Sequence, residues 1–112
     1  MESLGNPPPP PAAGNNTEAA FYTWAMNVAR KLAPDSPEIQ SIIRKELEDV
    51  LEGRASMDAW IRETRQRFGL RQDKLLKILY EAAKGLKGRE IAEVRREFKR
   101  QYEQARAFYG DY

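Results

Sequence analysis

The chain has 112 residues, of which 41% are hydrophobic and 32% are charged, a balance that suits one compact domain with a strongly charged surface. It contains no His and no Cys. Their absence excludes catalytic sites built on a histidine base or a cysteine nucleophile, disulfides, and zinc sites that use either residue. We therefore expect a protein that is not an enzyme, with no catalytic residues, no metal and no cofactor.

The net charge of +2 is unevenly distributed along the chain. Residues 17–53 hold four Lys or Arg against seven Asp or Glu, whereas residues 54–112 hold fifteen against nine. An acidic front half and a basic back half predict opposed surfaces, and the basic surface is suited to a polyanionic partner such as DNA or RNA.

The first residues lack the basic stretch and apolar run of a secretory signal, and no apolar run is long enough to cross a bilayer. We therefore expect a protein of the cytoplasm, or one packaged inside a virus particle, that is not secreted and has no membrane partner.

Residues 1–16 are predicted to form a flexible, Pro-rich arm in front of an all-helical domain over residues 17–112. The unbroken run from Pro7 to Pro11 cannot donate hydrogen bonds to a helix or sheet and favours an extended polyproline II conformation. Such an arm serves either as a spacer or as a contact to a protein partner or a neighbouring subunit.

From Thr17 onward, apolar residues recur at helical spacing and no stretch alternates as a strand would. Ser36 and Ser56 are typical N-cap residues, and glycines mark the predicted helix ends. We predict five helices, over residues 17–33, 37–52, 57–68, 72–84 and 89–109. The fold class is all-α: a compact bundle of about five helices, orthogonal or helix-turn-helix-like. The apolar face expected for the second helix is Ile39, Ile42, Ile43, Leu47, Val50 and Leu51.

One acidic run lies on the second helix and could in principle bind a cation. Its members are Glu46, Glu48, Asp49 and Glu52. All of them avoid the apolar stripe of that helix, so we expect them to form a solvated face without chemistry of its own.

Residues 61–80 carry the most specific local pattern in the chain. Gly69 falls where a tight turn would join two helices, Leu70 follows as an anchor, and Leu75 and Ile78 would seat the second helix on the first. This segment resembles the helix-turn-helix of prokaryotic DNA-binding proteins. It departs from that pattern at Arg65, where the close approach of the two helices usually requires a small residue. The same spacing also occurs at a helix–Gly–helix corner of an ordinary bundle.

The resemblance implies that the second of these helices lies in a major groove. It would expose Arg71, Gln72, Lys74, Lys77 and Tyr80 toward the bases, with Arg62, Arg65 and Arg67 near phosphates.

The last predicted helix separates its charges on two sides of its apolar stripe. Glu90, Glu93 and Glu97 lie on one flank. The other flank carries Arg89, Arg95, Arg96, Lys99, Arg100 and Arg106. A basic flank of this size could follow a phosphate backbone. The alternative is a surface helix with ordinary salt bridges between residues three apart.

These patterns together favour a non-enzymatic nucleic-acid-binding protein. It could be a helix-turn-helix regulator, or an architectural or coat-type nucleoprotein subunit that forms a homo-oligomer or filament. The second plan is similar, in architecture only, to the helix-plus-arm coat proteins of filamentous archaeal viruses. The predicted nucleic-acid-binding residues are Arg62, Arg65, Arg67, Arg71, Gln72, Lys74, Lys77, Arg89, Arg95, Arg96, Lys99, Arg100 and Arg106.

The alternative from another functional class is a helical protein–protein adaptor that uses the charge-split last helix and the Pro-rich arm. An exposed apolar patch around Phe21, Tyr22 or Trp60 would favour the adaptor over the nucleic-acid-binding protein.

Overall fold

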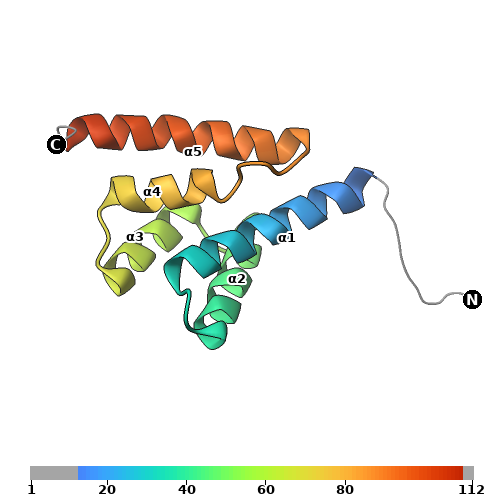
Figure 1. The fold of residues 1–112 in the computed structure, drawn as a ribbon, viewed down its shortest axis with the longest axis horizontal. Coiled ribbons are helices and arrows are strands. Elements are labelled where there is room, and N and C mark those ends of the chain that lie inside the picture. The colour runs from blue at the N-terminus through green and yellow to red at the C-terminus, as the bar shows by residue number, and fades with distance from the viewer. Residues whose placement is uncertain (1–12, 110–112) are drawn as a thin grey trace, which may run out of the picture.

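A computed structural model describes residues 13–109, with side chains from Glu18 onward, as five helices joined by short turns (Figure 1). The helices are α1 (Ala13–Leu32), α2 (Pro37–Leu51), α3 (Met57–Phe68), α4 (Gln72–Glu81) and α5 (Arg89–Phe108). No strand occurs within residues 13–109. The predicted all-α bundle of five helices is therefore confirmed.

The first helix begins at Ala13, four residues before the predicted start at Thr17. No proline lies between Pro11 and Pro34, so no missing N–H group stops the helix from extending toward the N-terminus. The rest of the predicted arm, including the proline run, lies outside the described residues.

The predicted caps define the borders of α2 and α3. The Ser36 hydroxyl accepts a hydrogen bond from the Ile39 N–H at 3.2 Å, and the Ser56 hydroxyl accepts one from the Ala59 N–H at 3.3 Å. Gly69 ends α3 in the left-handed conformation with φ 65°, which a side chain would disfavour.

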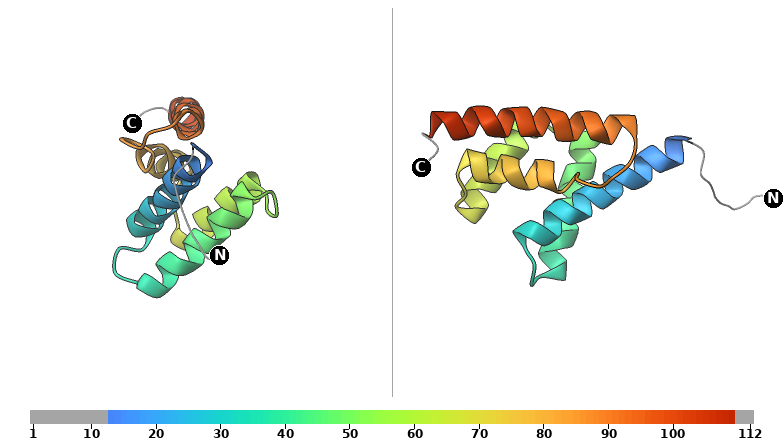
Figure 2. Two further views of the ribbon diagram at one scale, coloured as in Figure 1. Left: turned by 90° about the vertical axis from the view of Figure 1, so that its right-hand side faces the viewer. Right: turned by 45° about the horizontal axis from the view of Figure 1, so that its top comes forward.

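The helices pack as two main pairs that are held together by α1. The most extensive packing joins α4 to α5 and α1 to α2. Figures 1 and 2 show α5 along one side of the molecule with α4 antiparallel beneath it, α3 below α4, and α2 packed against α1. Because α5 is twice as long as α4, its N-terminal half extends beyond α4 and faces α1.

The centre of the core is Trp24 of α1, which is fully buried. Its indole Nε1–H donates a 2.8 Å hydrogen bond to the carbonyl of Leu79 in α4. Its ring stacks on Phe98 of α5, with ring centroids 6.1 Å apart, and meets the edge of Phe21 at 6.5 Å. One side chain therefore joins three helices through both an apolar surface and a polar contact.

The predicted apolar face of α2 is only partly buried. Ile43 and Leu47 are fully inaccessible to solvent, but Ile39, Ile42 and Leu51 are exposed. The prediction of a wide buried stripe is wrong here because α1 covers one side of α2 and α3 makes only a small contact with it. Ile42 lies on the uncovered flank, and Ile39 and Leu51 lie at the two ends of the helix.

Replacing Trp24 with Phe should destabilise the fold by about 2–4 kcal/mol, because it removes buried volume and leaves the Leu79 carbonyl without its donor. Urea unfolding followed by far-UV circular dichroism measures this loss. Trp60→Phe is the matched control. Trp60 is also buried, but its Nε1–H donates to the half-exposed Glu46 carboxylate, which keeps Arg67 as a partner. Equal losses in the two variants would contradict the central role of Trp24.

Candidate nucleic-acid interface

Arg65, the residue that departs from the helix-turn-helix pattern, forms hydrogen bonds across the turn between α3 and α4. The Leu70 N–H donates to the Arg65 carbonyl at 3.0 Å, and the Arg65 side chain returns a 3.3 Å hydrogen bond from Nε to the Leu70 carbonyl. Arg65 therefore lies across the turn, where its length is accommodated. Its guanidinium helps to hold the corner.

Arg71, predicted to face the bases, makes contacts with other side chains of the protein. Its Nε and Nη2 donate to the two carboxylate oxygens of Asp73 at 2.9 and 2.7 Å, and its guanidinium carbon lies 4.7 Å from the centre of the Tyr109 ring. The contact with Tyr109 joins the start of α4 to the end of α5. The hydrogen bonds from Arg71 lower the pKa of the Asp73 carboxyl and raise the pKa of Arg71 itself.

The exposed side of α4 offers three of the predicted residues, Gln72, Lys74 and Lys77. Tyr80, also predicted to face a groove, is half-buried and packs on Tyr102 of α5, with ring centroids 5.5 Å apart. Because α5 lies along α4, the outer face that could enter a groove is narrower than the sequence suggested.

The arginines of α3 do not form a common surface. Arg62 is exposed, whereas Arg67 donates to the Glu46 carboxylate of α2 at 3.1 Å. No local sequence pattern predicts the ion pair between Arg67 and Glu46, which are 21 residues apart.

The cations on the basic flank of α5 differ in their contacts and in their exposure to solvent. Arg95 donates from Nη1 to the carbonyl of Ala83, just past the end of α4, at 3.1 Å. Arg100 pairs with Glu97, three residues before it. Arg89, Arg96, Lys99 and Arg106 are exposed.

A cleft of about 320 Å³ opens where the end of α4 meets α5, and we refer to it as the basic cleft. Its lining residues are Tyr80, Lys84, Ala92, Arg95, Arg96 and Lys99. Four of these six carry positive charge and none carries a carboxylate. The arrangement is suited to an anion of the size of a phosphate group, with a tyrosine ring beside it.

Lys84 belongs to this cleft although the sequence analysis did not select it. It lies in the turn after α4, and its ammonium stands 5.6 Å from the centre of the Tyr80 ring and 3.9 Å from the Glu81 carboxylate. Lys84 is seven residues after Lys77 and four after Tyr80, so continuing the α4 spacing by one turn would have placed it on the same side.

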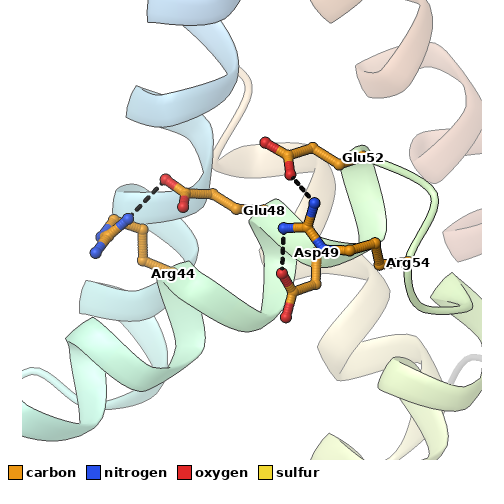
Figure 3. Close-up of polar contacts among 5 residues, drawn as sticks. All are labelled: Arg44, Glu48, Asp49, Glu52 and Arg54. Atoms are coloured by element: carbon orange, nitrogen blue, oxygen red, sulfur yellow. Dashed lines mark hydrogen bonds and ion pairs between the residues drawn. The ribbon is translucent and has the colours of Figure 1, made fainter.

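The acidic run of α2 is neutralised by arginines (Figure 3). Arg44 donates to Glu48 at 2.6 Å, and Arg54 bridges Asp49 and Glu52. Glu46 accepts from both Trp60 and Arg67. The side chains of the acidic run stay 31% to 58% exposed, and their ion-pair partners come from α2 itself, from α3 and from the turn after α2.

Two searches of the described residues gave no further site. Residues 13–109 hold no cluster of carboxylates suited to a metal ion. None of their helices combines the length and apolarity needed to span a membrane. Comparisons with protein-family models, with curated proteins and with solved structures gave no match.

Replacing Asp73 with Asn should destabilise the protein at pH 7, because the lowered pKa of Asp73 means that folding favours its charged form. That contribution is present above the ordinary aspartate pKa. It is lost as the pH falls from about 4 through the lowered pKa of the folded state. The stability difference between wild type and variant, measured by urea unfolding, should therefore shrink below pH ~4.

Glu97→Gln is the control for this measurement, because the Glu97 pKa is also lowered by Arg100 but the side chain is half exposed to solvent. The loss of stability caused by Glu97→Gln at pH 7 should be smaller than that caused by Asp73→Asn, because surface ion pairs contribute little. A pH-independent difference for Asp73→Asn would show that the Arg71–Asp73 pair contributes nothing through charge.

Proposed function

We propose that this protein binds nucleic acid through the phosphate backbone, with the basic cleft between α4 and α5 as the centre of the contact. The observation that carries the proposal is the cleft's lining of Lys84, Arg95, Arg96 and Lys99 without a carboxylate. Arg95 donates to the Ala83 carbonyl and Lys84 lies 3.9 Å from the Glu81 carboxylate, whereas Arg96 and Lys99 are exposed.

The geometry favours contacts to phosphate over reading of bases. Lys77 lies three residues before Tyr80 and extends the positive surface along α4, with Lys74 one turn further. The cleft lies at a helix–helix junction, where an extended phosphate backbone could lie. A tyrosine at the edge, Tyr80, could also stack against an unpaired base.

The α3–α4 corner supports a second mode, in which α4 enters a major groove. Its left-handed Gly69 turn agrees with a helix-turn-helix. The side chains then available to bases are Gln72, Lys74 and Lys77, since Arg71 is engaged by Asp73. The two modes predict different effects of substitutions on α4 and in the cleft.

Neutralising the cleft with Arg96→Gln and Lys99→Gln should weaken binding at low salt by at least about tenfold. It should also make the salt dependence less steep by about 0.9 per lost duplex phosphate contact and about 0.7 for single strands. Fluorescence anisotropy with duplex DNA, single-stranded DNA and single-stranded RNA across a salt series measures both quantities.

The matched control removes the same charge elsewhere, with Arg30→Gln on α1 and Lys45→Gln on α2, both exposed. This variant should retain the wild-type salt dependence. If the two double variants weaken binding equally, net charge alone explains the affinity and the cleft is not the site. Absence of binding by the wild type at low salt would refute the proposed function itself.

Lys74→Gln with Lys77→Gln distinguishes the two modes. If α4 reads bases, this pair should reduce the preference for one duplex sequence over random duplex. If the backbone alone is bound, it should weaken all nucleic acids by the same factor. Sequence preferences taken from a randomised duplex library provide the comparison.

A further inference from the structure

On the side of α5 away from the basic cleft, the molecule carries an apolar groove of about 530 Å³. Its apolar lining includes Phe21 of α1, Leu51 of α2, Met57 of α3 and Val94 of α5. Its rim is acidic, with Asp58, Glu90, Glu93 and Glu97, and no Lys or Arg lines it. Leu51 is 39% exposed at the edge of this groove. Apolar grooves on protein surfaces are typical of sites that bind an apolar partner.

The same side of α5 ends in an exposed aromatic side chain. Phe108 is 84% exposed, the highest value among the large hydrophobic residues that the structure describes. It lines a neighbouring depression that shares Asp58 and Gln101 with the apolar groove. Val94, Gln101 and Phe108 are spaced seven residues apart, so they lie on one side of the helix.

Phe108 is presented from a fixed helix end. Its ring meets the Tyr109 ring edge-on at 5.5 Å, and Tyr109 in turn holds the guanidinium of Arg71. Its distance from Val94 along the same helix is about 21 Å at 1.5 Å per residue, so the residue cannot reach its own groove. Phe108 and the apolar groove lie on one face but are too far apart to meet within one chain. Phe108 of one copy could instead enter the groove of a second copy.

We propose that two copies of this chain associate through α5, with Phe108 of each copy seated in the apolar groove of the other. A two-fold axis near Gln101, midway between Val94 and Phe108, brings the two α5 helices together antiparallel. This orientation keeps the acidic N-terminal halves of the two α5 helices at opposite ends of the interface. A parallel pair would instead place Glu90, Glu93 and Glu97 of one copy against the same residues of the other. The dimer leaves both basic cleft surfaces on its outside.

The proposal does not rest on nucleic-acid binding, and the test needs no ligand. Sedimentation equilibrium of the full chain across micromolar to submillimolar concentrations should show a monomer–dimer equilibrium without higher species. Phe108→Ala should raise the dissociation constant of the dimer at least about 30-fold, since it empties both grooves of a central aromatic anchor. Leu51→Glu should have a similar effect, because it buries a charge in the groove.

Ile39→Glu is the matched control for Leu51→Glu. Ile39 is on the same helix and is also 39% exposed, but it does not line the groove. It should leave the dissociation constant of the dimer unchanged. Far-UV circular dichroism and urea unfolding of each variant under monomeric conditions verify that the fold is retained.

Mixing the two defective variants provides the decisive measurement. Phe108→Ala retains the groove and Leu51→Glu retains the aromatic anchor, so an equimolar mixture regains one of the two contacts. It should associate more tightly than either variant alone. A wild type that stays monomeric, a Phe108→Ala chain that dimerises as tightly as wild type, or a mixture no tighter than its components would overturn the proposal.

Discussion

The structure depends on a single buried contact, the indole of Trp24 between α4 and α5. Its Nε1–H satisfies the Leu79 carbonyl near the end of α4, and its ring supports Phe98 in the middle of α5. Both helices therefore pack against the same side chain, which helps to fix their separation. The basic cleft and the apolar groove lie on the two sides of α5, so the position of each also depends on Trp24.

The charge separation on α5 has a structural explanation beyond intrahelical salt bridges. The flank with Arg95 and Lys99 borders the end of α4, whereas the flank with Glu93 and Glu97 borders the groove facing α1 and α3. The Glu97–Arg100 ion pair connects the two flanks. The two charged flanks of α5 therefore border two different surfaces of the molecule.

Local signals in the sequence were sufficient for the helices but not for the contacts that shape the site. The serine caps at Ser36 and Ser56 and the turn at Gly69 act within a few residues, and the predicted borders of α2 and α3 agree with the structure. The pairing of Arg67 with Glu46 joins residues far apart in the sequence, and no local pattern reveals it. The exposure of Ile42 could not be predicted for the same reason, because the neighbouring helices determine how much of the apolar face of α2 is buried.

The end of α4 also has a consequence for the order in which the molecule assembles. Three carbonyls at or just past the end of α4, those of Leu79, Ala82 and Ala83, accept hydrogen bonds from Trp24, Asn27 and Arg95 respectively. A helix of only 10 residues is marginal in isolation, so α4 gains its stability from partners that are distant along the chain. Arg95 follows α4 along the chain, so it is synthesised after α4. The basic cleft therefore cannot form before α5 has been synthesised, and a chain truncated before α5 lacks it.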